Sequence, residues 1–292
     1  MSDSKSPARA AAAPAPSDEG SARTFDTPLS REAIERALDL ADAVRVEVVD
    51  QTGSTNDDLL EVARLCAPAK PAVRAALHQF AGRGRHGRRW HDARGRALLF
   101  SVVTPWSRDA ASASAVTVAC GISVAEALRQ QGIEARLKWP NDLLLSGRKL
   151  GGILTELAID PDGRSSLVVG VGVNLCLDPE TRVAIDQPAA ALDERVMETR
   201  LVSEREQWIA LLARAVLETI ERFDHEGFAP FRARFDDLFC YAGRSVVLMQ
   251  AGLPALAGVA TGVDAEGRLL LSTDQGVQAV SSGELSLRAS DA

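Results

Sequence analysis

The sequence predicts an α+β fold, in which a mixed β-sheet carries helices on one face and a small separate β-barrel follows. Segments with strand-like alternation are interleaved with helix-like apolar segments between residues 31 and 238. After Tyr241 the chain changes to short apolar segments separated by Gly, Ser and Asp, which is typical of a small barrel. Apolar residues make up 46% of the 292 residues, so a sizeable core can form.

The first elements follow from caps and periodicity. Residues 1–24 are mostly Ala, Pro and Ser, and we expect a disordered tail because they offer too little apolar surface to offset the entropy cost of ordering. Ser30 caps a helix, and alternating valines predict a strand over 44–49. Thr55 and Asn56 begin a second helix, since the DDLLEVARL segment places acids in its first turn.

The later elements are predicted in the same way. AVRAALHQ and ALLFSVV are strands on either side of an Arg- and Gly-rich loop, and an apolar helix covers 112–131. ARLKW, KLGGILTELAI and SLVVGVGVNL are strands, and helices cover 203–224 and 228–238. The barrel strands are SVVLMQ, AGVATGVD, RLLLST and VQAVSSGELSLR. The predicted divisions are a tail over 1–24, a main domain over 25–238 and a barrel over 241–290.

Composition argues against several classes of protein. The formal net charge of −7 gives no broad basic surface for nucleic acid. No apolar run approaches the roughly 18 residues of a membrane span, and the N-terminal residues lack the apolar region of a secretory signal. We therefore expect a cytoplasmic protein. The cysteines lack metal-site or disulfide spacing and are expected to be free thiols: Cys66, Cys120, Cys176 and Cys240.

The loop HQFAGRGRHGRRW, residues 78–90, has two interpretations. Its glycines let the backbone amides approach an anion, and its arginines can bind phosphate or carboxylate with two hydrogen bonds each. Trp90 offers a flat face for adenine or another ring. Both capture of a small anionic ligand and nucleic-acid binding fit these residues, and so does a solvated basic loop.

Four further segments carry polar groups whose roles stay open on their own. GSTN, residues 53–56, provides hydroxyl and amide groups at a helix start, or simply an N-cap. KWPND ends in Asp142, which could orient a ligand or form an ordinary turn, and Lys149 could face a carboxylate or lie on the surface. The alternate glycines of GVGVN allow close approach to that strand, and Asn174 ends it.

Taken together, the order STN, HQFAGRGRHGRRW, KWPNDLLLSGRKLGGILTE and VVGVGVNL resembles the biotin–protein ligases. The resemblance covers roughly residues 44–235, and the C-terminal barrel resembles the small SH3-like domain of that family. It implies a two-step reaction. Biotin and MgATP give biotinyl-5′-AMP and pyrophosphate, and a lysine of an acceptor protein then displaces AMP. ATP, Mg²⁺ and biotin are the implied ligands, and the arginine loop would close over the adenylate.

The resemblance also implies roles for individual residues. Ser54, Thr55 and Gln79 would hold biotin at its ureido ring, and Asn56 would also bind biotin. Gly82 and Arg83 would lie near the carboxylate and Gly152 beside the ligand. The adenylate-binding residues would be Arg83, Arg85, Arg88, Trp90, Lys149 and Asn174. The catalytic residues would be Lys149, which also contacts biotin, Arg85 and Asp142. Asp142 would assist magnesium, ribose or the incoming lysine, and no metal ligand besides it is expected.

The implied partner is the biotin carboxyl carrier domain of acetyl-CoA carboxylase or of another biotin-dependent carboxylase. We expect no binding to nucleic acid or to membranes, and the sequence does not decide between a monomer and a homodimer. Two alternatives remain, a lipoate or octanoate ligase or transferase and a nucleic-acid-binding regulator. A single helix before the first strand cannot form a winged helix-turn-helix, so we expect a ligase without operator binding.

The loop departs from the family pattern at two positions. Phe80 follows the glutamine where a second polar residue is common, and His86 stands where arginine is common. Because histidine titrates near neutrality, we expect closure of the loop to depend on pH there. An unchanged pH–rate profile in His86→Arg would contradict this expectation.

Overall fold

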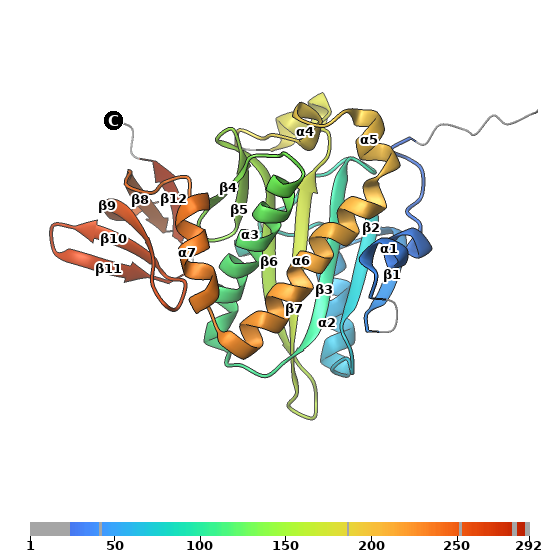
Figure 1. The fold of residues 1–292 in the computed structure, drawn as a ribbon, viewed down its shortest axis with the longest axis horizontal. Coiled ribbons are helices and arrows are strands. Elements are labelled where there is room, and N and C mark those ends of the chain that lie inside the picture. Colours follow the sequence, from blue (N-terminus) through green and yellow to red (C-terminus); the bar gives the residue numbers. More distant parts are fainter. Residues whose placement is uncertain (1–23, 41–42, 186, 251–252, 282–284, 290–292) are drawn as a thin grey trace, which may run out of the picture.

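The computed structural model describes residues 24–40, 43–185, 187–250, 253–281 and 285–289. These residues form two sheets (Figure 1), one with seven strands in the order β1-β2-β3-β7-β6-β5-β4 and one with five in the order β11-β10-β9-β8-β12. In the larger sheet β1 and β2 are parallel and the other neighbouring strands are antiparallel. The predicted fold class is confirmed, whereas residues 1–23 of the predicted tail lie outside the described residues.

Strand bounds in the seven-stranded sheet follow the predicted alternation. The strands are β1 (Arg45–Thr52), β2 (Ala72–Gln79), β3 (Ala97–Trp106), β4 (Ala135–Lys138), β5 (Asp142–Leu145), β6 (Arg148–Ile159) and β7 (Ser165–Asn174). The helices are α1 (Arg31–Leu38), α2 (Thr55–Leu65), α3 (Ala113–Gln130), α4 (Pro179–Ala184), α5 (Glu198–Ser203), α6 (Arg205–Glu226) and α7 (Ala229–Leu238). Ser30 accepts a hydrogen bond from the amide of Ala33 and so caps α1 as predicted.

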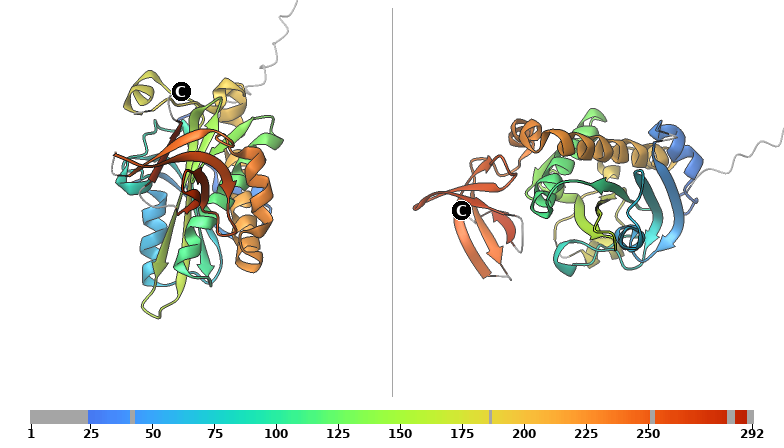
Figure 2. Two further views of the ribbon diagram at one scale, coloured as in Figure 1. Left: turned by 90° about the vertical axis from the view of Figure 1, so that its left-hand side faces the viewer. Right: turned by 90° about the horizontal axis from the view of Figure 1, so that it is seen from below.

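Helices cover the two faces of this sheet unequally. α3 and α6 pack together across one face with α1 beside α6, while α2 packs on the opposite face against β3, β6 and β7 (Figures 1 and 2). The prediction that the helices lie on one face therefore needs correction for α2. The reason is strand alternation, because β7 directs Val169 into the main core and Val168 into a second, smaller core beneath α2.

The second face is thus only partly covered by a helix. α2 contributes Leu59, Leu60 and Ala63 to the smaller core and begins at Thr55. Beyond that helix start, glycine and polar residues interrupt the large apolar residues on the same face of the sheet, among them Ser101, Gly170 and Gly172. This end of the sheet is where a ligand can approach the strands.

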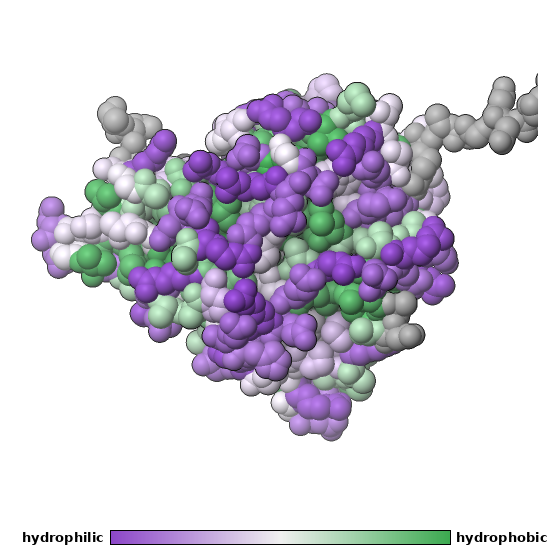
Figure 3. All heavy atoms as spheres, viewed as in Figure 1, coloured by the Kyte–Doolittle hydropathy of each residue, from purple (hydrophilic) through white to green (hydrophobic). Residues whose placement is uncertain are grey.

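The segment Ala110–Gln130, which contains α3, has the length and composition of a membrane span, although no such run was expected from the sequence. Two-thirds of its most apolar window (67%) is buried inside the protein, as in the core helix of a globular domain. Figure 3 shows the side of the molecule that carries α6. Its surface is largely hydrophilic, with hydrophobic residues in small separate areas.

The smaller sheet is antiparallel and follows α7. Its strands are β8 (Ser245–Gln250), β9 (Leu253–Val263), β10 (Leu269–Thr273), β11 (Gly276–Val280) and β12 (Leu285–Ala289). It contacts the larger part through α7 and through the turn before β10, where the carbonyl of Gly267 accepts a 3.1 Å hydrogen bond from the Trp139 indole N–H. The separate β unit predicted after Tyr241 is therefore present.

Candidate active site

A cavity of about 710 Å³ opens on the face of the seven-stranded sheet that α2 leaves uncovered. Part of its floor is a row of directly paired residues on β3, β7, β6 and β5, namely Leu99, Gly172, Gly152 and Asp142. The predicted site residues that line the cavity are Ser54, Thr55, Asn56, Gln79, Arg83, Arg85, Arg88, Trp90, Asp142, Lys149, Gly152 and Asn174. Gly82 is the one predicted site residue outside this lining, and its carbonyl accepts a hydrogen bond from the amide of Trp90 at 2.8 Å.

The alternate glycines of β7 make room for two of these side chains. A Cβ at position 172 would lie 2.8 Å from two atoms of the Trp90 indole, so the ring rests directly on the strand. A Cβ at position 170 would overlap Asn56 Oδ1 and lie 3.0 Å from Asn56 Cγ. The close approach expected from the GVGVN segment is therefore present at both glycines.

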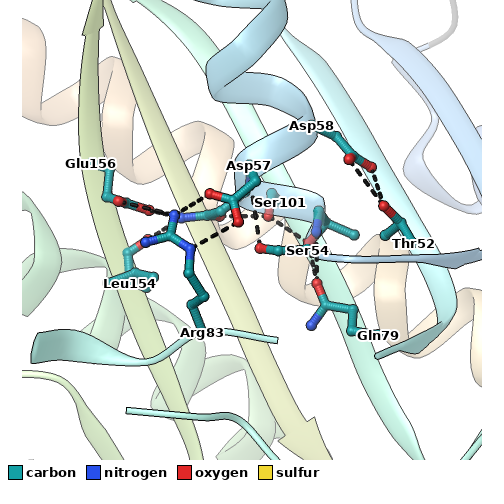
Figure 4. Close-up of polar contacts among 11 residues, drawn as sticks. Thr52, Ser54, Asp57, Asp58, Gln79, Arg83, Ser101, Leu154 and Glu156 are labelled. Atoms are coloured by element: carbon teal, nitrogen blue, oxygen red, sulfur yellow. Dashed lines mark hydrogen bonds and ion pairs between the residues drawn. The ribbon is translucent and has the colours of Figure 1, made fainter. Parts of the chain in front are cut away.

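One part of the cavity is a buried, uncharged hydrogen-bond network (Figure 4). Gln79 Oε1 accepts from the Thr55 amide at 2.7 Å and from its hydroxyl at 3.0 Å. The Thr55 hydroxyl also lies 2.7 Å from Ser101 Oγ, which donates to Asn56 Oδ1 at 2.6 Å. Because Ser54 caps α2, the start of this helix fixes the position of both Thr55 and Asn56.

The Arg/Gly loop folds as a hairpin beside this network. The amide of Gly84 donates to the carbonyl of Arg88 at 2.7 Å, and Arg83 and Arg89 form a β-bridge. His86 lies at the tip with φ of 58°, in the left-handed region, where histidine occurs more readily than β-branched residues. The hairpin contributes Arg83, Arg85, Arg88 and Arg89 to the lining of the cavity.

The arginines of the hairpin differ in their surroundings. Arg83 pairs with Asp57 of α2 and with Glu156 of β6, the latter at 2.8 Å. Burial opposes the charged form of Arg83, but these two carboxylates outweigh it and raise the pKa of the guanidinium. Burial lowers the pKa of Arg85, partly offset by the charge of Asp142, and Arg85 Nη1 lies 3.3 Å from Asn141 Oδ1.

Two of the three residues expected to be catalytic, Lys149 and Asp142, face each other across β5 and β6. Lys149 Nζ lies 2.7 Å from Asp142 Oδ1, and both side chains are largely buried. The backbone of Lys149 is held by Pro188 and Ala190, whose segment forms another wall of the cavity. Asn174 Nδ2 donates to the carbonyl of Ala190 at 2.9 Å, so Asn174 secures the same wall.

Three residues that form hydrogen bonds with the predicted site residues were not themselves predicted from the sequence. They are Asp57, Ser101 and Glu156. Ser101 and Glu156 are polar residues on the site face of otherwise apolar strands, and that contrast is the signal that would have identified them. Asp57 is one of two acids in the first turn of α2, where the favourable helix dipole alone explains an acid.

The described residues contain no group of three or more His, Cys, Asp or Glu side chains arranged to hold a metal ion. Asp142 is the carboxylate that lines the cavity, and it is already paired with Lys149. Magnesium is usually held by one or two carboxylates together with substrate phosphates, and a single cavity carboxylate fits that mode of binding.

Comparison with known proteins agrees with this geometry. Residues 48–174 match the model of the Biotin/lipoate A/B protein ligase family, and residues 243–288 match that of the Biotin protein ligase C terminal domain. The sheet with its cavity and the C-terminal unit thus define a protein of the biotin and lipoate protein ligase class.

Similar whole proteins narrow that class. The chain is 32% identical to the bifunctional ligase/repressor BirA of Escherichia coli over 93% of this chain and 83% of the relative. It is 34% identical to the biotin–[acetyl-CoA-carboxylase] ligase of Mycobacterium tuberculosis, over 82% of this chain and 88% of the relative. The biotin protein ligase of Aquifex aeolicus in complex with biotin and ATP has a TM-score of 0.67 at 27% identity, covering 84% of this chain and 99% of that one.

The chain belongs to the biotin protein ligase family. The family and the enzyme class that the sequence predicted, a biotin protein ligase, are thereby confirmed.

Proposed function

We propose that this protein activates biotin with ATP as biotinyl-5′-AMP and transfers it to a lysine of a biotin carboxyl carrier domain. The observation that carries the proposal is the shared cavity. It brings the uncharged network of Thr55, Gln79 and Ser101 together with the cations Arg85 and Lys149. An uncharged polar group fits a cyclic urea, and the cations fit a carboxylate and phosphates.

The first half-reaction uses these charges at the reacting atoms. In our proposal the biotin carboxylate attacks the α-phosphate of ATP, and pyrophosphate leaves. Lys149 neutralises the negative charge that builds up between the carboxylate and the α-phosphate, and Asp142 keeps the ammonium in place from 2.7 Å. Arg85 and Arg88 bind the phosphates, and Trp90 packs on adenine.

In the second half-reaction the amine of the acceptor lysine attacks the carbonyl of the mixed anhydride, and AMP leaves. The hairpin shields the anhydride from water until the acceptor arrives. Earlier, in the first half-reaction, Asp142 would hold magnesium together with the ATP phosphates, and the ion would supply further charge neutralisation. In our proposal Asn174, which lines the cavity, contacts the adenine edge, and Gly152 leaves room for the ligand.

The proposal also covers the acceptor protein, the cellular compartment, the domain bounds and operator binding. The acceptor is the carrier domain of acetyl-CoA carboxylase or of another biotin-dependent carboxylase, and the protein acts in the cytoplasm. The main domain covers 25–238 and the barrel 241–290. We propose a ligase without operator binding, because in the part of the chain that the structure describes α1 packs on α6 and forms no helix pair suited to DNA.

The test is transfer of label to an added carrier domain with MgATP, with biotin, lipoate and octanoate offered in parallel. Biotin alone should be transferred, and Lys149→Ala and Arg85→Ala should each abolish most of the transfer. Lys70→Ala is the matched control, because Lys70 is an exposed lysine outside the cavity. Transfer of lipoate or octanoate in place of biotin would overturn the proposed substrate.

Operator binding is tested separately by a gel shift with biotin-operon DNA at low and physiological salt. No specific shift is expected at either salt concentration. A specific shift would contradict the proposed single function, and salt-dependent binding to any sequence would favour the nucleic-acid alternative.

A further inference from the structure

Glu156 lies where two parts of the site meet. It is on β6, on the same face as Leu154 and the cavity floor, and its side chain is 26% exposed. Its carboxylate accepts a 2.9 Å hydrogen bond from Asn56 Nδ2 and pairs with Arg83 at 2.8 Å (Figure 4). One carboxylate therefore holds both the start of α2 and the first half of the hairpin.

The carboxylate fixes which way the Asn56 amide points. A carboxylate paired with a guanidinium only accepts hydrogen bonds, so the NH₂ group of Asn56 must face Glu156. The carbonyl of Leu154, another acceptor, lies 3.3 Å from the same Nδ2. Asn56 Oδ1 is thereby directed at Ser101, 2.6 Å away.

The orientation of the Asn56 amide fixes the donor and acceptor roles of two hydroxyls, those of Ser101 and Thr55. Ser101 has one hydroxyl proton and must donate it to Asn56 Oδ1, so Ser101 Oγ offers only a lone pair toward Thr55. The other polar neighbour of the Thr55 hydroxyl is Gln79 Oε1, which is also an acceptor. The Thr55 proton is therefore directed into the protein, and the oxygen of Thr55 is left with lone pairs toward the cavity that it lines.

Resting on the proposed function, we propose that Glu156 is a positioning residue that sets the direction of the chain Asn56, Ser101, Thr55. With this direction Thr55 accepts a hydrogen bond from a ring N–H of the cyclic urea of biotin. A ligand that offers only acceptors at this place meets another lone pair and is rejected. Glu156 thus selects for an N–H donor without touching the ligand.

The test compares biotin with an analogue in which oxygen replaces both ureido N–H groups, a cyclic carbonate. Binding of each ligand is measured by titration calorimetry to the full chain and to Glu156→Gln. In the parent, the carbonate should bind at least about tenfold more weakly than biotin. In Glu156→Gln the new amide can donate to Asn56 Oδ1 as well as accept from Asn56 Nδ2, so the chain can run in either direction. Biotin should then bind about tenfold more weakly, and the ratio of the two dissociation constants should fall toward one.

Asp58→Asn is the matched control. Asp58 is also 26% exposed and also paired with an arginine, Arg74, but it bonds Thr52 and is no part of the chain through Asn56. It should keep the parent's preference for biotin over the carbonate. Ser101→Ala interrupts the same chain without removing a charge, and should lose the preference even if Glu156→Gln folds poorly.

The outcomes separate this inference from the proposed function. If the parent binds biotin and Glu156→Gln and Ser101→Ala keep its preference for biotin over the carbonate, Glu156 does not set the direction and the inference is overturned. Failure of the parent itself to bind biotin would instead overturn the proposed function.

Discussion

Gly170 offers a sharp test of how the sheet supports the site. In Gly170→Ala the new Cβ would overlap Asn56 Oδ1 and lie 3.0 Å from Asn56 Cγ and 3.3 Å from Ser101 Oγ. Asn56 must therefore move, which breaks its 2.9 Å bond to Glu156 and its 2.6 Å bond from Ser101. A hydrogen bond to a charged group stabilises by about 1.5–3 kcal/mol, so we take about 2 kcal/mol as the cost of the displaced arrangement.

In our proposal the network of Asn56, Ser101 and Thr55 binds biotin, so the loss of these hydrogen bonds lowers the affinity for biotin. About 2 kcal/mol corresponds to a roughly 30-fold rise in the KM for biotin. The assay is pyrophosphate release at varied biotin and saturating ATP, and then at varied ATP. Gly172→Ala is the matched variant on the same face of β7, and it should affect the KM for ATP more, because its Cβ would lie 2.8 Å from the Trp90 ring. An unchanged KM for biotin in Gly170→Ala would refute the argument.

Three further outcomes are expected. Lys149→Ala should slow formation of biotinyl-5′-AMP by about 10²-fold or more in a rapid-quench assay, with little change in Tm. Burial opposes ionisation of Asp160, but the amides of Ala67 and Arg164 and the Arg164 guanidinium outweigh it and lower the pKa of Asp160 to about 2 from its ordinary 3.8. The stability that Asp160 contributes is therefore present above about pH 4 and lost as the pH falls toward 2, so thermal scans should show Asp160→Asn less stable than the parent at pH 7 but not at pH 2. Cys66 is exposed, whereas burial raises the pKa of the Cys120 thiol, so a thiol reagent should label Cys66 in the native protein and Cys120 only after unfolding.

Long periodic segments were predictable from the sequence, and short ones were not. The helix predicted over 203–224 corresponds to α6 (Arg205–Glu226), and that over 112–131 to α3 (Ala113–Gln130). β5, which has four residues, was not predicted, and neither were α4 and α5, which have six residues each. Segments of that length contain too few apolar repeats to distinguish a period of 3.6 from one of 2.

The residues at the cavity were predictable where chemistry concentrates in a motif. Lys149 and Asp142 lie in one motif, and the structure brings them within 2.7 Å. Ser101 lies outside the motifs and Glu156 at the end of one, and their importance depends on strand pairing between segments far apart in the chain. The face of the sheet on which α2 packs was not predicted, because a helix of this length can cover either face.

The hydrogen bond from Trp139 to the carbonyl of Gly267 limits how freely the two parts of this protein can be exchanged with those of its relatives. Gly267 has φ of 71°, and a Cβ there would lie 3.2 Å from Ala115 Cα in α3. A chimera would therefore have to bring a turn of the same shape, with a carbonyl in the same place. A graft without that carbonyl would leave a buried indole N–H unpaired one residue before the Pro140–Asn141–Asp142 turn, and its defect would appear in biotin activation rather than in the grafted sheet.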